Sequence, residues 1–169
     1  MKENFKESLA LVLKHEGGYV DHPADPGGAT MKGITLATFS AFKKKPMTKD
    51  ELRAISDADV ETIYKTGYWD AMRCDELAAG VDLLAFDMAV NKGVNRATRL
   101  MQQAAGVRDD GVLGPMTLAA IRKMPAKDLI VKVSEGRRDF YMSLKTFPVF
   151  GRGWLRRVDE TEKEALHAA

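Results

Sequence analysis

The stretch HEGGYVDHPADPGGATMKGIT, residues 15–35, breaks a helical pattern near the start of the chain. The apolar residues before it recur at helical spacing: Phe5, Leu9, Val12 and Leu13. Gly17 and Gly18 then stop that helix. The stretch holds five glycines and two prolines, so it predicts turns and a short hairpin rather than another helix.

The rest of the chain is patterned as helices, so we expect an all-α fold with one small β-hairpin or loop insertion near the N-terminus. Residues 81–93, VDLLAFDMAVNKG, are apolar on most faces and predict the central buried helix. A capping box is expected from Thr48 to Glu51, and Pro115 suits the first position of a helix. FPVFGRG, residues 147–153, predicts a break before a last helix that starts near Trp154.

Length and composition fit one compact globular unit. The chain has 169 residues, 45% of them hydrophobic and 30% charged. Residues 1–85 carry a net charge of −3 and residues 86–169 a net charge of +5. The basic second half either favours a polyanionic partner or consists of solvated helix faces.

Several chemistries are disfavoured by the residues present. Three histidines and the single cysteine, Cys74, are too scattered for a zinc site, so we expect no metal and no cofactor. The basic residues are too sparse for a nucleic-acid binder. We expect no membrane insertion, because no segment approaches the length of a membrane span.

Glu16 is an unusual residue for its position. It lies four residues after Val12 and three after Leu13, so it continues the apolar face of the first helix. It also lies at the negative end of that helix. Both placements disfavour the ionised carboxylate, which suits a general acid. A solvated glutamate, or one paired with a cation, is the structural alternative.

The glycine-rich stretch supplies a second carboxylate, Asp25, and a hydroxyl, Thr30. Glycosidases use one carboxyl group to protonate the leaving oxygen and another group to orient water or stabilise the sugar cation. Asp25 could instead form a turn before Pro26. Asp21 and His22 are rival candidates in the same stretch.

The motif Glu-Gly-Gly, then Asp-x-Gly-Gly-x-Thr, then Gly-Ile-Thr resembles the signature of glycoside hydrolase family 108, phage endolysins and related muramidases. Residues 85–121 are similar to the peptidoglycan-binding-type region that accompanies this family. The resemblance implies a lysozyme-like fold, with a catalytic part at 1–79 and a helical peptidoglycan-binding-type part at 80–169, packed as one unit. It also implies that Glu16 is the general acid and that Asp25 and Thr30 orient water.

Three further residues are candidates for substrate contact. Asn91 resembles a cleft-lining amide, and a helix cap is its alternative. Tyr68 and Trp69 either stack on sugar rings or pack between helices.

The expected enzyme is therefore a lysozyme, or N-acetylmuramidase, that cleaves the β-1,4 bond between N-acetylmuramic acid and N-acetylglucosamine. The alternatives are a lytic transglycosylase and a non-catalytic peptidoglycan-binding or secretion accessory protein. The expected partner is the peptidoglycan glycan strand.

The N-terminal sequence does not read as a signal peptide. We therefore expect synthesis in the cytoplasm and action on the cell wall after release. The route would be a holin, as in a phage or prophage, or a secretion system.

Overall fold

A computed structural model describes residues 2–23 and 27–169 of the chain. The described part is mainly α-helical, with one small antiparallel sheet, as the sequence predicts. The helices are α1 Lys2–His15, α2 Leu36–Lys43, α3 Lys49–Arg53, α4 Asp57–Tyr64, α5 Val81–Lys92, α6 Val94–Ala105, α7 Pro115–Lys123, α8 Ala126–Met142 and α9 Phe147–Ala168. A one-turn π-helix, Lys65–Trp69, and a short 3-10 helix, Cys74–Glu76, join α4 to α5.

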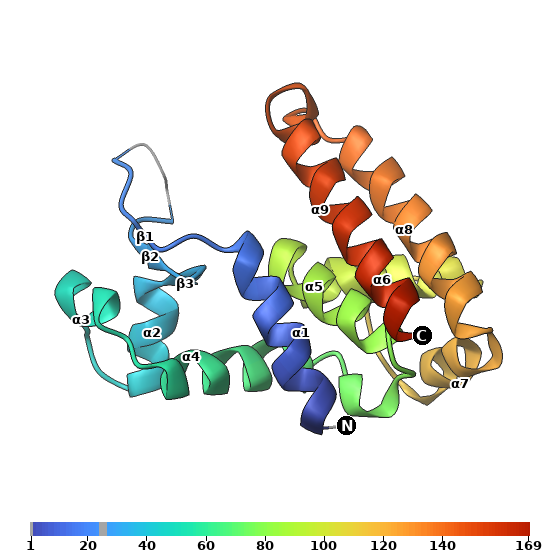
Figure 1. Cartoon of the computed structure of the whole chain (residues 1–169), viewed down its shortest axis with the longest axis horizontal. Helices are drawn as coiled ribbons and strands as arrows, with labels where there is room; N and C mark the ends of the chain where they lie inside the picture. Colours follow the sequence, from blue (N-terminus) through green and yellow to red (C-terminus); the bar gives the residue numbers. More distant parts are fainter. Residues whose placement is uncertain (1, 24–26) are drawn as a thin grey trace.

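The glycine-rich stretch contributes a three-stranded sheet rather than a single hairpin. Its strands are β1 Tyr19–Val20, β2 Thr30–Met31 and β3 Ile34–Thr35, in the order β1-β2-β3. Thr30 lies opposite Val20 on one side and Thr35 on the other. Figure 1 shows this sheet beyond the C-terminal end of α1, on the far side of that helix end from α8 and α9.

Helix α5 is central, as its apolar sequence predicts. All of its first nine residues, Val81–Ala89, are buried. Phe86 packs edge-on against Phe5 of α1 and against Trp69, with ring centroids 5.8 and 5.4 Å apart. Helices α1, α6, α8 and α9 all contact α5. Burial of these large rings stabilises the core that holds the end of α1 against α9.

The local signals for helix ends are confirmed. Thr48 and Glu51 form the expected capping box, and Pro115 is in the first turn of α7. Gly106 ends α6 in the left-handed conformation, with φ of 72°.

The predicted start of the last helix near Trp154 is wrong, because α9 begins at Phe147. Pro148 lies in its first turn, where a missing amide proton costs no helix hydrogen bond. Gly151 then fits under the Phe147 ring, since a Cβ there would come within 2.4 Å of that ring. Proline and glycine, which are typical of a helix break, therefore belong to the first turns of α9.

No helix among residues 2–23 and 27–169 is both long enough and apolar enough to cross a membrane.

Candidate functional site

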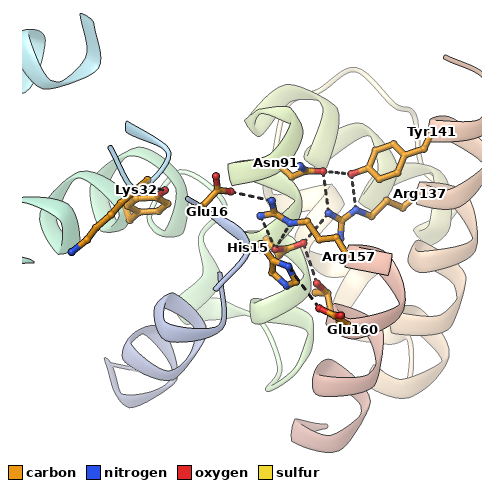
Figure 2. Close-up of polar contacts among 11 residues, drawn as sticks. His15, Glu16, Lys32, Asn91, Arg137, Tyr141, Arg157 and Glu160 are labelled. Atoms are coloured by element: carbon orange, nitrogen blue, oxygen red, sulfur yellow. Dashed lines mark hydrogen bonds and ion pairs between the residues drawn. The ribbon is translucent and has the colours of Figure 1, made fainter. Parts of the chain in front are cut away.

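Glu16 lies at the junction between the sheet and the C-terminal helices. It is the first residue after α1, and its amide donates to the carbonyl of Leu13 at 3.3 Å. Its side chain is 20% exposed. Residues that surround this carboxyl group come from the β2–β3 turn, from α4 and from α9. Figure 2 shows the carboxyl group of Glu16 directed toward Arg157.

The turn between β2 and β3 contacts one oxygen of Glu16. Lys32 and Gly33 both have positive φ, 50° and 78°, as expected for the tight turns that join twisted strands. A Cβ at Gly33 would lie 2.8 Å from Oε2 of Glu16 and 2.7 Å from the hydroxyl of Tyr64. Glycine is therefore required both by the backbone and by the carboxyl group beside it.

Tyr64 holds this turn in place from α4. Its hydroxyl donates to the carbonyl of Lys32 at 2.6 Å. Burial, and then the negative charge of Glu16, raise the pKa of Tyr64, so its hydroxyl stays a proton donor. Tyr68 lies beside Tyr64, and burial, and then the charge of Glu16, raise its pKa too. Its ring centroid is 5.6 Å from that of Tyr64.

Arg157 of α9 holds the other oxygen of Glu16. Its Nη1 donates to Oε1 at 3.0 Å, and its Nε donates to Oδ1 of Asp87 at 3.0 Å. Arg157 Nη2 lies 2.9 Å from the same Asp87 oxygen without the alignment of a hydrogen bond. One guanidinium therefore joins the candidate acid to a buried carboxylate on α5.

Asp87 is the centre of a buried charge network. It is 1% exposed, and its Oδ2 lies 2.8 Å from Nη2 of Arg137 and accepts from the Thr161 hydroxyl at 3.2 Å. Burial alone would raise the pKa of Asp87, but the two adjacent guanidinium groups outweigh it and hold that pKa below its usual range. Asp87 therefore lies between two guanidinium groups, one of which, that of Arg157, also holds Glu16.

Asn91 is joined to this network through its side-chain oxygen. Its Oδ1 accepts from the Tyr141 hydroxyl at 2.5 Å and from Nη2 of Arg137 at 3.3 Å. Gly93, not Asn91, is the capping residue at the end of α5. The side-chain oxygen of Asn91 is thus used within the protein (Figure 2).

Trp69 does not present its ring to a ligand. The side chain is completely buried, and its Nε1 donates to Asp75 at 3.0 Å. Of the two alternatives for this residue, packing between helices is the one that the structure favours. Tyr68, by contrast, is only partly buried.

The remaining candidates lie in the glycine-rich stretch. Thr30 is partly buried in β2, on the strand that leads into the Lys32–Gly33 turn. Asp25 lies outside the described residues. Asp21, a rival to Asp25, pairs with Lys49 at 2.8 Å.

A separate pocket lies on the other side of the network. It has a volume of about 240 Å³ and opens between α1 and α9, with Asp87, Thr161 and the His15–Glu160 pair among its lining residues. Nδ1 of His15 and Oε2 of Glu160 are 3.8 Å apart. Glu16 does not line this pocket, so it is distinct from the candidate catalytic position.

Among residues 2–23 and 27–169, no three His, Cys, Asp or Glu side chains gather in a way that could hold a metal ion.

The residues that the sequence reasoning missed are the cations and the buried acid. Arg137 and Arg157 come from helices far along the chain, and nothing local marks them as partners of Glu16. Asp87 did offer a signal, because it interrupts a helix that is otherwise apolar. A buried carboxylate of this kind needs a cation and hydrogen bonds.

Comparison with known families agrees with the resemblance in the glycine-rich stretch. The family model described as glycosyl hydrolase 108 matches residues 9–93, and a second, described as a predicted peptidoglycan domain, matches residues 96–159. The chain belongs to glycosyl hydrolase family 108. Glu16, Gly33, Tyr64 and Asp87 fall in the first matched region, and Arg157 falls in the second.

A solved structure similar over nearly the whole chain is that of SagA from Brucella abortus. The two chains are 42% identical, with a TM-score of 0.90, over 99% of this chain and 97% of that one. The mainly α-helical, lysozyme-like fold expected from the sequence is therefore confirmed. A search of curated proteins found no significant match.

Proposed function

We propose that the protein is an N-acetylmuramidase, a peptidoglycan hydrolase that cleaves the β-1,4 bond between N-acetylmuramic acid and N-acetylglucosamine. The observation that carries this proposal is the setting of Glu16. Its carboxyl group is held from two sides, by the β2–β3 turn and by Arg157, yet it keeps part of its surface open. The match to a predicted peptidoglycan domain supports the choice of substrate.

In this mechanism Glu16 protonates the oxygen of the leaving sugar. Such a group must keep a fixed direction, because a misplaced proton donor is far less effective. Gly33 limits movement on the Oε2 side, and the Arg157 hydrogen bond fixes Oε1. Asp25 and Thr30 keep their proposed role of orienting water, which the sequence motif supports.

Arg157 also supplies positive charge beside the carboxyl group. Its Nη1 lies 3.0 Å from Oε1 of Glu16, and this hydrogen bond fixes the direction of the carboxyl group. We infer that Arg157 acts through Glu16 as a positioning residue.

The decisive experiment is digestion of purified peptidoglycan by the wild-type protein and by Glu16→Gln, with mass spectrometry of the soluble products. The amide keeps the shape of the side chain but cannot donate a proton, so a loss of about 10²–10⁴-fold in turnover is expected. A hydrolase releases sugars that carry a new reducing end. A lytic transglycosylase releases anhydro sugars lighter by one water, and an accessory protein releases neither.

Wild-type activity that survives in Glu16→Gln would reject the assignment of the acid. Anhydro products would replace the muramidase proposal with the transglycosylase one. Delivery to the wall, through a holin or a secretion system, stays a prediction of the sequence.

A further inference from the structure

On the N-terminal side of Arg157, helix α9 carries a row of aromatic side chains on the face that holds Arg157. Phe150 and Trp154 precede Arg157 by seven and three residues, a spacing that places all three side chains on one side of a helix. The rings of Phe150 and Trp154 are 5.7 Å apart between centroids, and Tyr141 of α8 lies 5.4 Å from Trp154. Phe150 is 53% exposed. The row therefore leads from the partner of Glu16 to the exposed start of α9.

Beside this row, α9 is open to solvent at Gly153. A Cβ at Gly153 would meet no atom within 4 Å. Glycine weakens a helix relative to alanine, so nothing in the packing of α9 explains its presence at this position. Val149, four residues before, is 76% exposed, and Arg156, three residues after, is exposed as well. An absent side chain lets a ligand approach the helix backbone closely.

Two segments that contribute to the row and its neighbours carry basic side chains and no acid. Residues 88–108 and 140–158 contain no Asp or Glu. The two segments meet where Lys92 lies over the ring of Trp154, 3.9 Å from its centroid, and where Arg96 lies 4.3 Å over Phe140. Aromatic faces and cations together are suited to sugar rings that carry anionic groups.

Figure 1 shows how α9 lies relative to the end of α1, the helix that Glu16 follows. The N-terminal half of α9 rises beyond the end of α1, and the small sheet lies on the other side of that helix end. Glu16 contacts both sides, through Gly33 and through Arg157. A polymer that crosses Glu16 would therefore leave the site along α9.

We propose that this part of α9 is a second binding site for the peptidoglycan strand, beyond the bond that is cut. We name it the α9 platform, and its residues are Val149, Phe150, Gly153, Trp154 and Arg156. A sugar ring lies over Gly153, against the aromatic row, and carboxylates of the stem peptide bind Lys92 and Arg156. The inference rests on the proposed function, because it takes the same strand as its ligand.

An anionic lipid surface would also attract exposed apolar and basic side chains. It would not, however, account for an open glycine in the middle of the helix beside the partner of the candidate acid. The observations on Gly153 and Arg157 therefore favour a strand that lies along α9 over a bilayer that contacts only the tip of the α8–α9 hairpin.

The test is Gly153→Leu, made in the Glu16→Gln background so that the ligand is not cut. Leucine fits the open space and favours the helix, so the melting temperature should stay the same or rise. Its side chain would occupy the place of the sugar. We expect binding to purified sacculi, measured by co-sedimentation, to weaken roughly tenfold, the equivalent of about 1.4 kcal/mol.

Gly136→Leu in α8 is the matched control. Gly136 is also helical, and a Cβ there also meets no atom within 4 Å. It lies two residues before Arg138, which pairs with Asp159 of α9, and two residues correspond to about 200° around a helix. Gly136 therefore faces away from α9, and its leucine variant should bind sacculi like the parent protein.

A second pair of variants covers the case in which Gly153→Leu does not fold. Phe150→Ser removes an exposed ring of the platform, and Met116→Ser, at a residue 83% exposed on α7, is its control. Weaker binding in Phe150→Ser alone supports the platform. Equal binding in both members of each folded pair overturns it.

Two further results are distinguishable. If the platform variants lose binding to vesicles of anionic lipid but keep binding to sacculi, the site is a membrane contact and the inference is wrong. Binding is measured without cleavage, so a wild-type protein that fails to digest peptidoglycan would reject the proposed function without altering the binding result.

Discussion

The buried position of Asp87 predicts a large loss of stability in Asp87→Asn. The substitution keeps the shape of the side chain and removes one negative charge, so Arg137 and Arg157 lose the buried carboxylate that they share. Removal of one partner of a buried ion pair costs about 3–5 kcal/mol. That is a large part of the roughly 5–15 kcal/mol that stabilises a typical domain.

In a chain of this size, each kcal/mol lowers the melting temperature by about 2–4 °C. Asp87→Asn should therefore melt about 6–20 °C below the wild type, as measured by circular dichroism or calorimetry at neutral pH. Urea denaturation should give the same loss of free energy of unfolding.

Asp159→Asn is the matched control. Asp159 also pairs with an arginine, Arg138, and also joins α9 to α8, but it is 67% exposed. Exposed pairs contribute about 0–1 kcal/mol, so this variant should melt close to the wild type. Small and equal shifts in the melting temperatures of the two variants would refute the argument that Asp87 belongs to a buried network of paired charges.

The same geometry gives two other predictions, and the sequence motif gives a third. The pKa of Asp87 is lower in the folded protein than in the unfolded chain. The stabilisation that Asp87 contributes should therefore be complete above about pH 4 and be lost as the pH falls. Asp87→Asn should flatten the acid limb of a profile of melting temperature against pH. Gly33→Ala should lower both melting temperature and turnover, since its Cβ would meet the Glu16 carboxyl group, while Gly18→Ala, with open space around it, should keep its turnover. Asp25→Asn should lower kcat strongly and leave KM nearly unchanged if Asp25 acts in the transition state, which steady-state kinetics on soluble glycan will show.

The parts of the fold that could be predicted from the sequence are those with local causes. The capping box at Thr48–Glu51 and the proline at the start of α7 depend on neighbours a few residues away. The contact of Gly151 with the ring of Phe147 at the beginning of α9 is also between neighbours, but it exists only once the helix has formed. A proline and two glycines therefore predicted a break where the chain is helical.

The same distinction holds for the candidate site. Glu16 could be singled out because the end of a helix and the continuation of an apolar stripe are both visible in the sequence. Its burial beside Gly33 and its pairing with Arg157 depend on contacts across the molecule. Arg157 is 141 residues away along the chain, and no periodicity links two positions so far apart.

The Glu16–Arg157 contact also bears on how the two matched regions work together. The region matched by the glycosyl hydrolase model ends at residue 93, and Arg157 lies in the region matched by the predicted peptidoglycan domain. Asp87, in the first region, is held by arginines that both belong to the second. The second region therefore does more than cover the buried face of α5, because it also supplies the group that directs the candidate acid. The division of the chain near residue 79 stays a prediction, but the site itself is built from both sides of it.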